Sequence, residues 1–182
     1  MLNKEERKFL LKCARDTIHA RLNGKNLPEC KPQSKVLEEP MGAFVTLHAR
    51  GALRGCIGYV EAVKPLCQTV QEMAVAAAFQ DPRFPALREN EYDDIEIEIS
   101  VMSPLKRVRN VDEIQVGKHG IVIRRGFHSG LLLPQVATEQ GWDRDTFLEH
   151  TCYKSGLPGD AWRKKDTEIQ IFSAEVFSEK EY

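Results

Sequence analysis

A cysteine and an arginine lie two positions apart in the segment Leu53-Arg54-Gly55-Cys56-Ile57-Gly58, the most unusual stretch of the chain. A cysteine close to cationic side chains gains thiolate character and becomes a nucleophile. The planar guanidinium of Arg54 suits a carboxylate or a phosphate. The segment predicts a site in which Arg54 orients an anionic group and Cys56 is the nucleophile. The alternative is a buried structural cysteine beside an arginine that pairs with an acidic neighbour.

Two glycines in the same short strand are unusual, because glycine weakens a strand and gives it no side chain to pack. Gly55 and Gly58 therefore indicate close approach of another backbone or of a ligand, and we count both among the candidate binding residues.

The direction in which this strand points its side chains depends on the preceding hairpin. A two-residue turn at Arg50-Gly51 would need a positive φ at Arg50, so we expect a three-residue loop over 49–51 with Gly51 at the left-handed position. In that register Thr46 opposes Arg54, Phe44 opposes Cys56, and Leu53 faces the core. The shared polar face is then Thr46, His48, Arg54 and Cys56, which makes His48 a candidate base.

Acidic residues on a later strand offer partners for this site. Glu96 and Glu98 alternate on one face, about 7 Å apart by strand rise. Such a pair can serve an inverting glycosidase, although a solvated strand face is the commoner reason for alternation. We expect Glu98 to orient Arg54.

Further candidates lie elsewhere in the chain. His119 is a second candidate base, and Arg124 and Arg125 with the aromatic residue Phe127 form a small patch for a phosphate or nucleotide, or a solvated hairpin. The segment 81–85, Asp-Pro-Arg-Phe-Pro, is expected as a rigid loop at the edge of a cleft or as a tight helix exit with a salt bridge. No histidine or cysteine spacing predicts a metal site, and no cofactor motif is present.

Composition limits the classes of function. The 182 residues contain 26 Lys and Arg against 27 Asp and Glu, a net charge of -1, so nucleic acid can be bound only through a local patch.

The five cysteines have no C-x-x-C pair, and no apolar run approaches a membrane span. We expect free thiols, a cytoplasmic location and no membrane association. Cys13, Cys67 and Cys152 on helices and Cys30 in a loop need only ordinary packing or exposure.

Elements of the first half follow from periodicity and capping. Asn3 and Glu6 form a capping box for a helix that ends at Asn23-Gly24, and a proline-containing loop covers 24–42. Strands are expected over 43–48 and 53–60, followed by a helix with Pro65 in its first turn, and by a clear strand over 95–103.

The second half repeats this order. A hairpin over 120–125 and 130–133 precedes a helix capped by Asp143 and a strand over 169–177, with a bulge where the apolar phase slips between Ile171 and Phe172. The prediction is an α+β fold, a mostly antiparallel sheet with helices packed against it, in which strand-strand-helix-strand units over roughly 42–104 and 117–178 are duplicated.

The segment 53–58 resembles the AMMECR family, especially its microbial branch called AmmeMemoRadiSam system protein A. The resemblance extends over nearly the whole chain as a single AMMECR-type domain, and its most specific parts are the LRGCIG motif and the Leu-Leu-Leu-Pro-Gln sequence at 131–135. It departs from many relatives at Ala86, where they have a second proline. The resemblance implies an α+β fold with a larger and a smaller lobe. It implies no established activity, and the system name indicates Memo-type and radical S-adenosylmethionine proteins as partners.

Two functions follow as expectations. The first is an accessory or catalytic component of a modification pathway acting on an anionic metabolite, nucleotide or RNA, with Cys56 as nucleophile and His48 or His119 as base. The second is a non-enzymatic adaptor that docks a protein or RNA through the LRGCIG surface. Burial of Cys56 among apolar side chains would exclude the thiol chemistry.

Overall fold

The computed structural model describes residues 1–182, which form two compact units. The larger, unit 1, contains Met1–Met102 and Glu175–Tyr182, and unit 2 contains Ser103–Ala174. Each unit pairs antiparallel strands and covers them with helices, so the predicted α+β class is confirmed.

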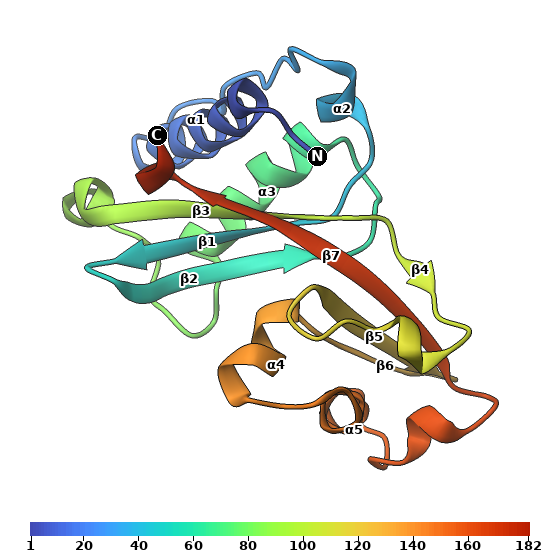
Figure 1. The fold of residues 1–182 in the computed structure, drawn as a ribbon. Coiled ribbons are helices and arrows are strands. Elements are labelled where there is room, and N and C mark those ends of the chain that lie inside the picture. Colours follow the sequence, from blue (N-terminus) through green and yellow to red (C-terminus); the bar gives the residue numbers. More distant parts are fainter. The chain divides into compact units, whose positions relative to one another are not determined.

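Unit 1 has three strands in the order β2-β1-β3, and the long helices α1 and α3 pack against them (Figure 1). Its buried apolar residues come from these helices and from one face of the sheet, chiefly Val45, Leu47, Ile97 and Ile99. The elements are α1 Lys4–Leu22, α2 Lys35–Glu38, β1 Ala43–Ala49, β2 Ala52–Tyr59, α3 Leu66–Phe79, the 3-10 helix η1 Glu89–Asp94 and β3 Ile95–Met102, with the 3-10 helix η4 Glu179–Glu181 at the C-terminus.

Unit 2 repeats the pattern, because β5 lies between its hairpin partner β6 and the last strand β7, as β1 lies between β2 and β3. The short β4 pairs with β7 on its other side, and α4 and α5 pack against β5 and β6. The elements are β4 Lys106–Arg107, the 3-10 helix η2 Val111–Glu113, β5 His119–Arg125, β6 His128–Leu132, α4 Pro134–Gln140, α5 Arg144–Lys154, the 3-10 helix η3 Ala161–Arg163 and β7 Glu168–Ser178, whose last four residues belong to unit 1.

The residues predicted to begin helices are found at the N-termini of those helices. The side chain of Asn3 accepts the N–H of Glu6 at 2.9 Å, and the carboxylate of Glu6 accepts the N–H of Asn3 at 2.7 Å. The capping box of α1 is therefore confirmed. The side chain of Asp143 caps α5 by accepting the N–H of Thr146, and Pro65 stands at the N-terminus of α3. The α4 helix is an element that the periodicity did not predict; its signals are Pro134 at the first helical position and Gly141 in a left-handed C-cap.

The predicted register of the first hairpin is wrong. Arg50 and Gly51 form a two-residue turn with φ values of 52° and 80°, and Thr46 lies opposite Cys56. A β-bulge leaves Arg54 without a partner on β1 and shifts the register by one residue, because Leu47 pairs with Gly55 while His48 pairs with Leu53. The bulge keeps Cys56 opposite Thr46 and Ile57 opposite Val45, so polar and apolar side chains lie on separate faces beyond it. It also places Leu53, 42% exposed, beside His48 instead of in the core.

The bulge predicted within β7 is also absent. Residues 168–173 pair with β5 in unbroken register, although Ile171 and Phe172 are both buried. Phe172 lies opposite Gly120, and a Cβ on that glycine would approach the Phe172 ring within 2.3 Å. The missing side chain of Gly120 therefore accommodates the second apolar residue without a change of register.

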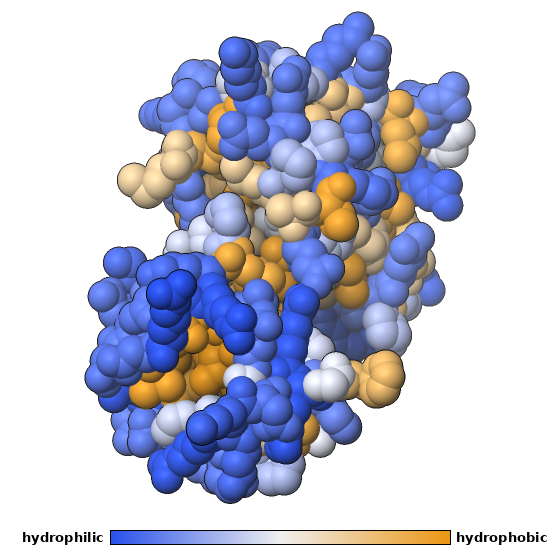
Figure 2. Space-filling model, turned by 90° about the vertical axis from the view of Figure 1, so that its right-hand side faces the viewer, coloured by the Kyte–Doolittle hydropathy of each residue, from blue (hydrophilic) through white to orange (hydrophobic).

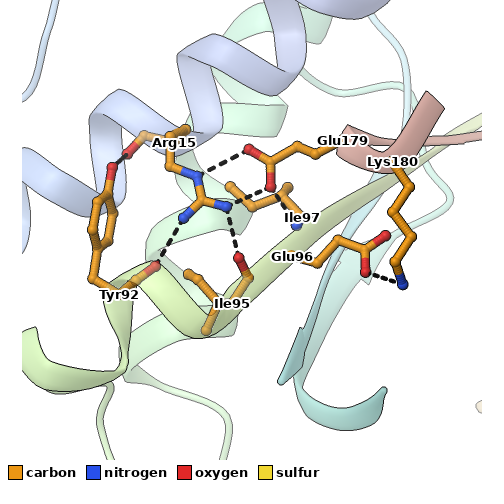
Figure 3. Close-up of polar contacts among 7 residues, drawn as sticks. All are labelled: Arg15, Tyr92, Ile95, Glu96, Ile97, Glu179 and Lys180. Atoms are coloured by element: carbon orange, nitrogen blue, oxygen red, sulfur yellow. Dashed lines mark hydrogen bonds and ion pairs between the residues drawn. The ribbon is translucent and has the colours of Figure 1, made fainter. Parts of the chain in front are cut away.

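The C-terminal residues are held in unit 1 by a polar network centred on Arg15 of α1 (Figure 3). The guanidinium of Arg15 donates to both carboxylate oxygens of Glu179 in η4 and to the carbonyl oxygens of Tyr92 and Ile95, at 3.0 and 2.8 Å. Glu179 also accepts from the N–H of Ile97 at 2.8 Å. One side chain thus ties the first helix, the start of β3 and the C-terminus together.

Replacing Arg15 by methionine should lower the free energy of unfolding by about 2–4 kcal/mol, because a partly buried carboxylate and two carbonyl groups lose their donors. The matched control is Lys12→Met on the same helix, which removes only an exposed pair with Asp16 and should cost about 0.5 kcal/mol. Urea unfolding followed by circular dichroism measures both. Equal midpoints for the two variants would contradict the role of the network.

The molecular surface is mostly hydrophilic on the face drawn in Figure 2, where hydrophobic side chains gather in a hollow in the lower part of the view. Single large hydrophobic residues such as Val63 and Phe127 are also exposed. None of the helices combines the length and apolar composition that a membrane-spanning segment requires.

Candidate functional site

Cys56 lies on β2, which is the edge strand of unit 1. Its partner on β1 is Thr46, and Thr46 is in turn opposite Glu98 on β3, so the three side chains form one row on the sheet face away from Val45 and Leu47. The hydroxyl of Thr46 donates to the Cys56 sulfur at 3.2 Å. The thiol is partly exposed, so complete enclosure among apolar side chains, which would exclude thiol chemistry, does not occur.

The open edge of β2 at Cys56 is covered by the segment that follows α3. The carboxylate of Asp81 accepts the N–H of Cys56 at 2.9 Å, and the guanidinium of Arg83 donates to the Cys56 carbonyl oxygen at 3.0 Å. These two side chains form hydrogen bonds with the N–H and the carbonyl oxygen of Cys56, which would otherwise pair with a neighbouring strand. The segment 81–85, expected as a rigid loop or as a helix exit with a salt bridge, thus holds the backbone of Cys56 from the edge.

Asp81 and Arg83 also hold each other. The Asp81 side chain is 1% exposed and that of Arg83 is 54% exposed, with Nε and Nη2 of Arg83 donating to the two carboxylate oxygens at 2.9 and 2.7 Å. Hydrogen bonds from Arg83 and from two backbone N–H groups hold the pKa of Asp81 well below its ordinary value, against the opposing effect of burial. The hydrogen bond with Asp81 raises the pKa of Arg83. A permanent cation therefore stands at the backbone of Cys56, and we call Thr46, Cys56, Asp81 and Arg83 the Cys56 cluster.

Arg54 has a different partner from the one expected. Its Nε and Nη2 donate to the carboxylate of Glu91 in η1 at 2.8 and 3.1 Å, and Glu98 makes no such contact. The hydrogen bond from Arg54 lowers the pKa of Glu91 against burial. Arg54 is 9% exposed, and its Nη1 is buried without a hydrogen-bond partner. Two of its three nitrogens are structural, and only Nη1 remains for another ligand.

The two glycines of the segment are explained by close packing. A Cβ on Gly55 would lie 2.2 Å from the carbonyl oxygen of Ala77 in α3, and a Cβ on Gly58 would lie 2.4 Å from that of Ala43. The expected approach of another backbone is therefore present at both positions. It brings α3, and with it the segment 81–85, close to the strand that carries Cys56.

The remaining candidates are distributed over both units. His48 shares the sheet face of Thr46 but lies opposite Leu53 and Glu96, and Glu96 pairs with Lys180. His119 and Arg124 belong to β5 of unit 2. The Nδ1 of His119 accepts the N–H of Gln115 at 3.2 Å, and burial with the charge of Lys118 lowers the pKa of His119.

Sequence reasoning did not connect Asp81, Arg83 or Glu91 with Cys56 or Arg54. The available signal was that Asp81 and Arg83 flank a proline directly after a helix. This spacing allows the two side chains to form an ion pair with each other. Throughout the chain, no group of three or more histidine, cysteine, aspartate or glutamate side chains is placed to hold a metal ion.

Comparisons with known proteins identify relatives of the whole chain. The family model AMMECR1 matches residues 11–177. A protein of Methanopyrus kandleri is 47% identical over 99% of this chain and 91% of its own length, and one of Methanothermobacter thermautotrophicus is 44% identical over 98% and 96%. The crystal structure of an uncharacterised protein from Pyrococcus horikoshii is similar with a TM-score of 0.88 and 39% identity, covering 98% of this chain and 94% of that one.

Proposed function

The chain belongs to the AMMECR1 family, and from the Cys56 cluster we propose that it acts on an anionic metabolite, nucleotide or RNA in a modification pathway. In this proposal the protein is cytoplasmic and is a catalytic or accessory component that works with Memo-type and radical S-adenosylmethionine proteins, as AmmeMemoRadiSam system protein A. The observation that carries it is a partly exposed Cys56 whose thiol accepts from Thr46 and whose backbone carbonyl accepts from the guanidinium of Arg83.

The chemistry of this arrangement favours attack by sulfur. A guanidinium next to a sulfur stabilises the thiolate, which is the nucleophilic form. Arg83 is half-exposed, so the same cation can meet the charge of an incoming anion, a task that the sequence assigned to Arg54. The role left to Arg54 is to hold η1 through Glu91 and to offer its one unpaired nitrogen.

Arg83→Gln should slow alkylation of Cys56 by iodoacetamide about fivefold, because one charge at contact distance in water is worth roughly 1 kcal/mol. The measurement is quantitative peptide mass mapping of Cys56 at fixed pH and low salt. The control is Arg50→Gln, which removes an arginine from the exposed turn of the same hairpin and should leave the rate unchanged. An equal rate in both variants would remove Arg83 from the proposed site.

The substrate class needs a separate experiment. Wild type and the Cys56→Ser variant are purified from cells, and the small molecules, RNA and proteins that accompany each are identified by untargeted mass spectrometry. The proposal expects an anionic compound enriched on one of them and released by inorganic phosphate. Recovery of partner proteins with no anionic compound would favour the adaptor function instead.

The adaptor function has one observation in its favour. Leu53, at the start of the LRGCIG motif, is 42% exposed on an edge strand, where an apolar side chain can meet a partner protein or RNA. Against it, Asp81 and Arg83 occupy the backbone groups of Cys56, which prevents a partner strand from pairing at that residue.

A further inference from the structure

Three cysteines that are distant in sequence come together in unit 1, away from the Cys56 cluster. Cys13 lies on α1, Cys30 on the loop before α2, and Cys67 in the first turn of α3. The sulfurs of Cys13 and Cys30 are 2.6 Å apart, so an approach of roughly 0.5 Å would reach the length of a disulfide bond. Cys67 points its sulfur at the carbonyl oxygen of Cys30, at 3.9 Å. The expectation that these cysteines need only ordinary packing overlooks this contact.

The two near sulfurs open onto a pocket of about 180 Å³ lined by α1 and by residues 28–33 of the loop. The charged side chains in its wall are Lys12 and Asp16, which pair with each other, and Glu29, which pairs with Lys31. The pocket is smaller than the roughly 300 Å³ at which sites for drug-sized ligands begin. It therefore favours a small group over a bulky one at Cys13 and Cys30.

The three thiols differ in pKa, and therefore in how readily each forms the reactive thiolate. A hydrogen bond from Cys30 lowers the pKa of Cys13, and one from Thr17 contributes, against the opposing effect of burial. The same contact with Cys13, together with burial, raises the pKa of Cys30. Burial raises the pKa of Cys67 to about 11. Cys13 is therefore the attacking sulfur, Cys30 holds the proton, and Cys67 stays reduced.

We propose that Cys13 and Cys30 form a dithiol site that reduces small alkyl disulfides entering the pocket. The Cys13 thiolate attacks one sulfur of the disulfide, whose S–S bond breaks and whose departing thiolate takes the proton of Cys30. The Cys30 thiolate then attacks the Cys13 sulfur of the mixed disulfide and expels the second small thiolate, which takes a proton from water. Two electrons pass from the protein to the small disulfide, leaving a Cys13–Cys30 disulfide and two small thiols.

The test uses the full-length reduced protein and cystamine, a small alkyl disulfide. After incubation and acid quenching, mass spectrometry should find the wild type lighter by two hydrogen atoms, and after alkylation the peptides of Cys13 and Cys30 should be cross-linked and carry no alkyl group. Oxidised glutathione, which is too large for the pocket, should react at least about tenfold more slowly. The closed loop should also raise the midpoint of thermal unfolding by about 6–12 °C.

Variants separate this site from the other cysteines. Cys30→Ser, in a loop, should stop the reaction at a stable mixed disulfide on Cys13, while Cys152→Ser and Cys56→Ser should react as the wild type does. The second control makes the result independent of the proposed function. A wild type that keeps both thiols open to alkylation, or a Cys30→Ser variant that carries the adduct elsewhere, overturns the proposal. The test does not depend on a Cys13→Ser variant that folds, because the adduct formed by Cys30→Ser already reports on the Cys13 sulfur.

Discussion

Replacing Gly55 by alanine should destabilise unit 1 by about 3 kcal/mol or more. The added Cβ would lie 2.2 Å from the carbonyl oxygen of Ala77, an atom of the helix backbone that no rotamer change can move. Either β2 or α3 must shift, and both belong to the core of the unit. The free energy of unfolding, measured by urea denaturation with circular dichroism, is the direct readout.

A control separates steric overlap from the general cost of losing a glycine. Gly24 has a φ of +63° and no atom within 4 Å of an added Cβ, so Gly24→Ala should cost about 1 kcal/mol, from backbone conformation alone. If Gly55→Ala loses no more than Gly24→Ala, the close packing of α3 on β2 is not what requires glycine in this segment.

Replacing Asp81 by alanine should cost about 2–4 kcal/mol, because the buried N–H of Cys56 loses its only side-chain acceptor and Arg83 loses its anchor. The loss should appear both as a lower midpoint of urea unfolding and as greater mobility of the Cys56 backbone. Hydrogen exchange at the Cys56 amide measures the second effect, and the exposed Asp94→Ala, which also pairs with an arginine, is the control.

The carboxylate of Asp81 also predicts how stability depends on pH. Its pKa is lower in the folded protein than in the unfolded chain, so its contribution is present above the unfolded value of about 3.9 and is lost as pH falls below it. Asp81→Asn keeps the shape but cannot titrate, so the variant should lose less stability than the wild type between pH 5 and the acid limit. If the free energy of unfolding of the two proteins falls in parallel as pH is lowered, another carboxylate determines the loss of stability in acid.

Much of the fold could be predicted from the chain alone because its signals are local. The capping box at Asn3, Pro65 before α3, Asp143 before α5 and the alternation over 95–102 act between residues a few positions apart. The α4 helix was missed because seven residues give too little periodicity to stand out.

The site was predicted less well, because its partners are set by long-range register and packing. The bulge at Arg54 changed which residue lies opposite Cys56, and no local rule chooses between a strained turn with a bulge and a relaxed three-residue loop. The partner of Arg54 proved to be Glu91 on a 3-10 helix rather than Glu98 on a strand.

The sequence by itself determined that the segment 53–58 carries an arginine, a cysteine and two glycines, in an α+β chain without bulk positive charge. Tertiary structure alone decided which groups surround those two side chains. It set Asp81 and Arg83 against the backbone of Cys56, and it brought Cys13 and Cys30 together beside a pocket. The reason is that capping and alternation act within a few residues, whereas a side chain's partners depend on how distant elements pack, and that packing is selected by the burial of the whole core.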